Sequence, residues 1–413
     1  MRARVAWLVS GWLALGLAWA ADPVVSNLTV TQRPGTKLVD IGYDLAAAEP
    51  VQIGMRLSAD DGATWTLPTA SLSGDLGVGI SAGVGKAVVW DMGADWDDQH
   101  TAQLRVEITA ADPVYLVIDL SAGSTATSYP VAYLWAIPVG GWTAEHKTTK
   151  LVLRRLPKTN PSFTMGSPLG ELGREINETQ HEVTLTQEFY IGVFELTQKQ
   201  WERVMGFWPS YFRNASVRDA RPVEMVSYDD IRGTSSGAGW PANSAVDAGS
   251  FMGKLRQKTG LTTLDLPTES QWEYACRAGT TTALNNGTNL TSTSQDANLA
   301  LVGRYYYNSG SGSYSVASGL AQGTAAAGTY LANAWGLYDL HGNVYEWCLD
   351  YYQTTDPGTV SDPPGAASGS DRVRRGGGSW FGIAASCRSA NCDGYPPSNR
   401  SSVIGCRVAR TLP

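Results

Sequence analysis

The segment that most constrains the fold of this chain is residues 333–350, which reads NAWGLYDLHGNVYEWCLD. Its large apolar residues can anchor a core, while its glycines permit tight backbone turns. Asp339, Asn343 and Glu346 supply hard oxygen ligands of the kind that can bind a cation. Two interpretations follow. One is a core loop that contains glycines and ends in polar residues, and composition alone favours it. The other is a cation-binding turn whose apolar side chains pack in the core.

A chain of 413 residues exceeds what one hydrophobic core usually organises, so we expect two domains. Charged residues make up only 17% of the chain and glycine contributes 45 residues, which indicates a loop-rich protein rather than a helical bundle. The net charge of -7 and the lack of a basic run argue against nucleic-acid binding.

The first twenty residues have the features of a signal peptide, because Arg2 and Arg4 precede an apolar run over residues 5–19. The tripeptide Ala18-Trp19-Ala20 fits a cleavage site, and the apolar run is short for a membrane-spanning helix. We therefore expect residues 1–20 to be removed and the mature chain to be secreted or periplasmic, with no membrane or lipid anchor.

Residues 21–111 alternate apolar and polar side chains, as in Val39, Ile41 and Tyr43, between turn signals such as Asp60-Asp61-Gly62. This period of two predicts half-buried antiparallel strands and favours an all-β sandwich of the immunoglobulin or fibronectin type. No chemistry is evident in it, so we expect a spacer or docking module. Asp112-Pro113 marks its end.

From Tyr115 onward the pattern mixes short strands and short helices with long Gly/Ser/Thr-rich loops. Alternating apolar residues predict strands at 115–120, 149–156, 181–185 and 189–194. Capping and stop signals predict helices from Thr197 to Gly206, over residues 246–258 before Gly260, and from Thr268 to Gly279.

The histidines and cysteines exclude some chemistries and leave others open. The four histidines lack metal-ligand spacing, so we expect no zinc site, and His341 is expected to be a hydrogen-bonded structural residue. Five cysteines leave at least one without an internal disulfide partner. Cys387 and Cys392 allow three interpretations: a disulfide with each other, a disulfide of either one with Cys276, Cys348 or Cys406, or a thiolate pair for redox work or for copper(I).

A set of motifs in the last two thirds of the chain resembles the formylglycine-generating enzyme family, also called the sulfatase-modifying factor domain. The resembling segments are residues 163–167 (FTMGS), 195–201, 222–228, 266–279, 335–347, 375–380, 387–390 and 405–409. The resemblance implies that residues 115–413 form an α+β domain of the C-type-lectin-like kind, with little regular structure and bound calcium. It also implies that Asn343, the carbonyl of Val344 and Glu346 match one calcium site, and that Asn298 and Leu299 match part of a second.

The family's best-known activity oxidises a cysteine in a C-x-P-x-R segment of a sulfatase to formylglycine, using O2 and a copper(I) ion held by two cysteines. This chain departs from that pattern, because the position of the first catalytic cysteine falls on Gly382. Cys387 and Cys392 keep a four-residue gap, but Cys387 adjoins the Arg-Ser-Ala motif. With Ser379, which the resemblance places beside the family's groove, they are the candidate catalytic residues.

Two functions are therefore expected. The first is an exported oxidase that acts on sulfatases or on another exported protein. The second is a non-catalytic, calcium-ordered binding protein for a glycan or protein ligand, in which the catalytic cysteine pair has been lost.

Overall fold

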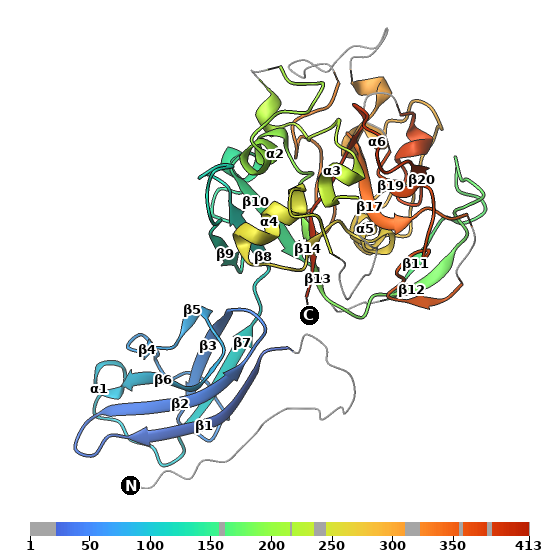
Figure 1. Cartoon of the computed structure of the whole chain (residues 1–413). Helices are drawn as coiled ribbons and strands as arrows, with labels where there is room; N and C mark the ends of the chain where they lie inside the picture. Colours follow the sequence, from blue (N-terminus) through green and yellow to red (C-terminus); the bar gives the residue numbers. More distant parts are fainter. Residues whose placement is uncertain are drawn as a thin grey trace. The chain divides into compact units, whose positions relative to one another are not determined.

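The computed structural model describes residues 22–156, 162–214, 217–234, 245–309, 323–354, 358–377 and 382–412. The described residues divide into two compact units, one of residues 22–114 with 133–135 and one of residues 115–132 with the described residues between 136 and 412 (Figure 1). Over the described parts of the chain, no helix has both the length and the apolar character needed to cross a membrane.

The N-terminal unit is built from antiparallel strands in two sheets, drawn in blue and cyan in Figure 1. The four-stranded sheet has the order β1-β2-β6-β4 and the three-stranded sheet the order β5-β3-β7. The elements are β1 (Val24–Gln32), β2 (Leu38–Ala46), β3 (Val51–Ser58), β4 (Ser73–Gly74), β5 (Gly77–Ile80), β6 (Gly83–Asp91), α1 (Met92–Asp95) and β7 (Arg105–Ala111).

The alternating pattern of the sequence determines which side chains these strands bury. In β2, Val39, Ile41 and Tyr43 are buried while the residues between them are partly exposed. They join Ile53 of β3 and Trp90 of β6 in one apolar cluster, so strands of both sheets contribute to a single core. The more specific immunoglobulin or fibronectin assignment stays a prediction.

The C-terminal unit combines several small sheets with few, short helices, which agrees with an α+β class (Figure 1). Its sheets have the orders β14-β22-β13-β10-β8-β9, β20-β19-β17-β21, β11-β12-β18 and β15-β16. The strands are β8 (Tyr115–Asp119), β9 (Val131–Leu134), β10 (Lys150–Arg155), β11 (Ser162–Met165), β12 (His181–Thr184), β13 (Phe189–Gly192), β14 (Leu264–Asp265), β15 (Gly303–Arg304), β16 (His341–Gly342), β17 (Tyr345–Tyr351), β18 (Val360–Ser361), β19 (Arg372–Arg375), β20 (Cys392–Tyr395), β21 (Ile404–Gly405) and β22 (Ala409–Thr411). The lectin-like assignment stays a prediction.

The helices begin where the sequence offers a capping side chain. They are α2 (Gln198–Met205), α3 (Tyr228–Arg232), α4 (Phe251–Thr259), α5 (Glu269–Arg277) and α6 (Leu299–Val302). Thr197 and Thr268 cap α2 and α5 through reciprocal bonds with the glutamine three residues later, as predicted.

Three details of the helix predictions were wrong. Helix α4 begins after its cap Ser250 rather than at Val246, because the Ser250 hydroxyl accepts the amide of Gly253 and so sets the first turn. Helix α5 ends at Arg277, and its C-cap is Ala278 in the left-handed conformation, one residue before the expected Gly279. Helix α3, capped by Ser227, was not anticipated.

The segment 333–350 is a loop without strand residues only up to Leu340, which corrects the core-loop interpretation. Residues 341–342 form β16, and residues 345–350 belong to β17, an inner strand of the sheet β20-β19-β17-β21. Leu337 and Leu340 pack with Trp272 in the core, so the aromatic and aliphatic residues anchor the unit as predicted. Gly342 has a φ of 78°, and a Cβ there would clash with the carbonyl oxygen of Arg304.

Candidate functional site

The three candidate catalytic residues do not form one group in the structure. Ser379 lies outside the described residues. Cys387 ends a short 3-10 turn (Ala384–Cys387), whereas Cys392 begins strand β20. The surroundings of the two thiols therefore have to be taken one at a time.

Cys387 is a core residue. Its side chain is 0% exposed and belongs to an apolar cluster that includes Leu284 and Tyr305. Burial raises the pKa of this thiol to about 12. Its carbonyl oxygen lies 2.7 Å from Nδ1 of buried His341, and Nε2 of the same ring accepts the amide of Asn285 at 3.0 Å. This confirms the structural role predicted for His341.

Cys392 lies in the wall of a cavity of about 250 Å³. It pairs across the sheet with Arg375 of β19, and Nδ2 of Asn177 lies 3.4 Å from its sulfur. Burial raises the pKa of this thiol well above its ordinary value, and the neighbouring carboxylate of Glu269 adds to the effect.

The cysteines do not fit a copper(I) site. Copper(I) requires thiolate sulfurs that converge on one ion, but Cys387 packs in an apolar cluster and Cys392 lines a cavity with both carboxylate and apolar walls. All five cysteines are buried free thiols, so none of the disulfides considered from the sequence is formed. Cys276, for example, donates to the hydroxyl of Ser389 at 3.6 Å.

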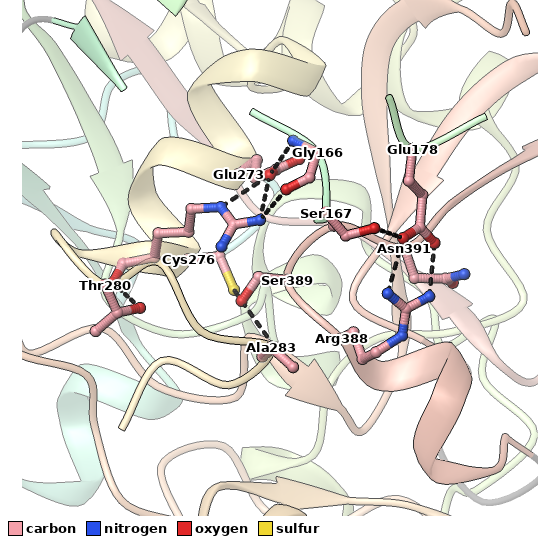
Figure 2. Close-up of polar contacts among 12 residues, drawn as sticks. Gly166, Ser167, Glu178, Glu273, Cys276, Thr280, Ala283, Arg388, Ser389 and Asn391 are labelled. Carbon is pink, nitrogen blue, oxygen red and sulfur yellow. Dashed lines mark hydrogen bonds and ion pairs between the residues drawn. The ribbon is translucent and has the colours of Figure 1, made fainter. Parts of the chain in front are cut away.

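The Arg-Ser-Ala motif after Cys387 forms buried hydrogen bonds with other segments of the C-terminal unit (Figure 2). Arg388 donates to both oxygens of Glu178, at 2.7 and 2.6 Å, and Ser167 donates to the same carboxylate at 2.6 Å. Ser389 donates to the carbonyl of Ala283 at 3.1 Å and accepts from Cys276. These buried contacts join segments that are far apart in the chain, so the motif stabilises the fold.

Asn343 and Val344 contact a carboxylate that sequence reasoning missed. The side-chain amide of Asn343 donates to Glu195 at 2.6 Å, and the backbone amide of Val344 donates to the same carboxylate at 3.2 Å. Oδ1 of Asn343 accepts the amide of Ala325 at 2.8 Å. The only signal for Glu195 was its position at the start of a family-like segment.

The negative charge of Glu346 is compensated by a residue of the same chain. Arg407 donates to it at 2.8 Å and Nε1 of Trp272 at 2.7 Å, and the side chains of both ion-pair partners are 0% exposed. Asp339 is also buried, and its Oδ1 has no hydrogen-bond partner within the described ranges. Glu195, Asp339 and Glu346 all lie near Arg407, so this region holds more carboxyl groups than cations, and burial raises the pKa of Glu195 and of Asp339.

These carboxyl groups do not amount to an assembled calcium site. Among the described residues, no group of three or more His, Cys, Asp or Glu side chains is arranged to hold a metal ion. At the second implied site, Nδ2 of Asn298 donates to the carbonyl of Asn289, and the backbone amide of Leu299 donates to Asp296, each at 2.9 Å. Calcium at either position stays a prediction.

Comparisons with known proteins place this geometry in a family. The model of the sulfatase-modifying factor enzyme 1-like domain matches residues 159–412. The formylglycine-generating enzyme of Mus musculus is 33% identical over 152 residues, which are 35% of this chain and only 38% of that enzyme. Chaperone protein LppX of Paenibacillus barcinonensis is 28% identical over 217 residues, 48% of this chain and 70% of that protein. The structure of Treponema denticola variable protein 1 aligns with a TM-score of 0.46 and 27% identity, over 64% of this chain and 96% of that one. This chain therefore belongs to the sulfatase-modifying factor enzyme 1-like domain family.

Proposed function

We propose that this protein is a non-catalytic member of its family, an exported binding protein that uses the family domain as a scaffold for a protein or glycan ligand. The observation that carries the proposal is the state of Cys387 and Cys392. Both thiols are buried, both have raised pKa values, and they face different surroundings. Oxidation through a copper(I) dithiolate requires two ionised sulfurs at one point.

The match to Chaperone protein LppX supports a protein ligand. The alignment covers 70% of that protein but only 38% of the Mus musculus formylglycine-generating enzyme. Its name is that of a chaperone protein. We therefore favour another exported protein over a glycan as the ligand of the family domain.

A peptide oxidation assay tests the proposal directly. The full-length protein, supplied with copper and air, is incubated with a C-x-P-x-R peptide, and mass spectrometry follows the loss of the thiol and the gain of an aldehyde. We expect no product, while a formylglycine-generating enzyme in parallel converts the peptide.

The oxidase remains the second candidate because the chain is 33% identical to two enzymes of that name, from Mus musculus and Thermomonospora curvata, over the matched segments. Aldehyde formation that disappears in a Cys392→Ser variant would establish the oxidase and overturn the non-catalytic proposal. Sulfatases would then be the partner class.

Calcium belongs to the proposal as a structural ion near Asn343, Val344 and Glu346, and near Asn298 and Leu299. The surplus of buried carboxylates around Arg407 supports the first position. Thermal unfolding in calcium and in EDTA tests it, with a lower Tm expected after chelation. An unchanged Tm, with no calcium detected by elemental analysis, would remove calcium from the proposal.

We further propose that the chain is secreted or periplasmic after cleavage behind Ala20, and that the N-terminal sandwich is its docking module. The apolar segment of residues 5–19 supports export. Cell fractionation with N-terminal sequencing of the mature protein tests it. Retention of Met1 on protein from the cytoplasmic fraction would contradict export.

A further inference from the structure

The cavity beside Cys392 is large enough for a small organic molecule. Its volume of about 250 Å³ exceeds the roughly 150 Å³ of a cavity that holds benzene. It is lined by the first two turns of α5, the end of β17, strand β19 and the loop before β12. Part of its wall is apolar and is formed by Met165, Val360 and Pro363.

The charges around this cavity do not balance. Four carboxylates line it, those of Glu178, Glu269, Glu273 and Asp350. Three of them have guanidinium partners, since Glu178 pairs with Arg388, Glu269 with Arg375 and Glu273 with Arg277, at 2.6, 2.6 and 2.8 Å. Asp350 is 3% exposed and forms no salt bridge with any described residue. Its Oδ2 accepts an uncharged donor, the backbone amide of Glu269, at 2.7 Å, and Arg375 is near enough to attract its charge without forming a salt bridge with it.

The same wall also has an excess of hydrogen-bond acceptors. Within the described parts of the chain, Oε2 of Glu273 and Oδ1 of Asn177 are buried and lack hydrogen-bond partners. Oε2 of Glu273 lies 2.9 Å from Nη1 of Arg375, but that nitrogen directs its hydrogen bonds to carbonyls such as that of Ala390 at 3.0 Å. Buried acceptors without donors are rare because each costs free energy. The cavity therefore favours an occupant that brings hydrogen-bond donors.

We propose that this cavity binds a small primary amine in its ammonium form, with Asp350 as the counter-ion. An ammonium group brings one positive charge and three N–H donors, which match the surplus carboxylate and the two acceptors. An anion would be repelled by the one carboxylate without an ion-pair partner, that of Asp350. A quaternary ammonium has no N–H to donate, and a neutral hydroxyl leaves the charge of Asp350 uncompensated. The alkyl part of the amine lies along Met165, Val360 and Pro363. The proposal does not depend on whether the protein oxidises cysteine.

Calorimetric titration of the full-length protein with n-butylamine tests the proposal. Burial raises the pKa of Asp350 to about 7, so a titration at pH 8 keeps this carboxylate ionised while the amine stays protonated. We expect saturable binding of butylammonium. Binding of n-butanol, which lacks the charge, and of tetramethylammonium, which lacks N–H donors, should be at least about tenfold weaker. No saturable binding of butylammonium, or equal binding of butanol, would overturn the proposal.

Two variants locate the binding. Asp350→Asn keeps an oxygen for the amide of Glu269 but removes the charge, so butylammonium should bind at least about tenfold more weakly. Gln353→Lys changes an exposed residue of the cavity wall, and its ammonium group should compete for Asp350 and weaken binding in the same way.

Asp230→Asn, which removes a carboxylate paired with Arg400 outside the cavity, should bind as the wild type does. Unchanged affinity in a folded Asp350→Asn protein would place the amine elsewhere and refute the proposal. If Asp350→Asn does not fold, the exposed Gln353→Lys variant decides, and unchanged affinity there has the same consequence.

Discussion

Replacing Arg388 with methionine should destabilise the C-terminal unit strongly, because its buried guanidinium forms several ion pairs and hydrogen bonds. The side chain is 0% exposed and donates to Glu178 and Glu171 and to the carbonyls of Gly173 and Ala385, at 2.6 to 2.9 Å. The side chain of Glu178 is itself 0% exposed. Methionine keeps most of the side-chain volume, so the loss comes from charge and hydrogen bonds rather than from a cavity.

The expected magnitude follows from the two carboxylates left behind. Removing one partner of a buried ion pair costs about 3–5 kcal/mol, because the remaining charge is desolvated and unpaired. A typical domain has a total stability of about 5–15 kcal/mol, so this is a large fraction of it. At about 2–4 °C for each kcal/mol in a domain of this size, Tm should fall by about 6–20 °C.

Differential scanning calorimetry of the full-length protein measures this change. Arg400→Met is the matched control, because Arg400 pairs with Asp230 at the surface, where its side chain is 54% exposed, and its loss should cost at most about 1 kcal/mol. Adding Glu178→Gln to Arg388→Met should recover part of the lost stability, because it removes one of the buried carboxylates left without an ion-pair partner. Equal effects of Arg388→Met and Arg400→Met, or no recovery in the double variant, would refute the reasoning.

Three further predictions concern other parts of the chain. Burial raises the pKa of Glu224 to about 7, so the wild type should lose stability as pH rises from about 4.5 to 7. Glu224→Gln should make the free energy of unfolding less dependent on pH, which urea unfolding at pH 5 and pH 8 measures. An equal change in unfolding free energy between the two pH values in both proteins would contradict this prediction. Gly342→Ala should abolish soluble expression because its Cβ would clash with the Arg304 carbonyl, whereas Gly336→Ala, which meets only the end of a flexible side chain, should cost about 1–2 kcal/mol. Similar Tm values for the two variants would contradict this. Iodoacetamide should label the native protein slowly and at Cys392 only, which is 7% exposed while the other four cysteines are 0% exposed. Intact mass should show five labels after unfolding, and fewer would indicate a disulfide.

Local signals in the chain were enough to predict much of the secondary structure. The reciprocal caps at Thr197 and Thr268 each involve residues only three positions apart. They can therefore be recognised in the sequence, and they predicted where α2 and α5 begin. The same kind of signal, Ser227 followed by Asp230, was present before α3 and could have been used. Apolar periodicity alone was less reliable, since it started α4 too early and left strand β17 unrecognised.

The candidate site could be predicted only in part, because its contacts join distant segments. The family resemblance identified Asn343 and Glu346 as neighbours in the chain, but not the contact of Asn343 with Glu195, which is 148 residues away in sequence. Likewise, no local pattern indicates that Asp350 accepts the amide of Glu269, 81 residues earlier, at the edge of a cavity. Such pairs depend on the path of the whole chain.

The two cysteines show the same division between local and tertiary information. Their spacing, the nearby Arg-Ser-Ala motif and the glycine at position 382 are properties of the amino-acid order, and they already predicted family membership and a departure from its catalytic pattern. Spacing could not distinguish a disulfide from a metal pair or from two separate thiols, because sulfur positions depend on which segments pack around them. Packing places Cys387 among apolar side chains and Cys392 against a cavity with carboxylate and apolar walls, and the resulting burial raises the pKa of both thiols.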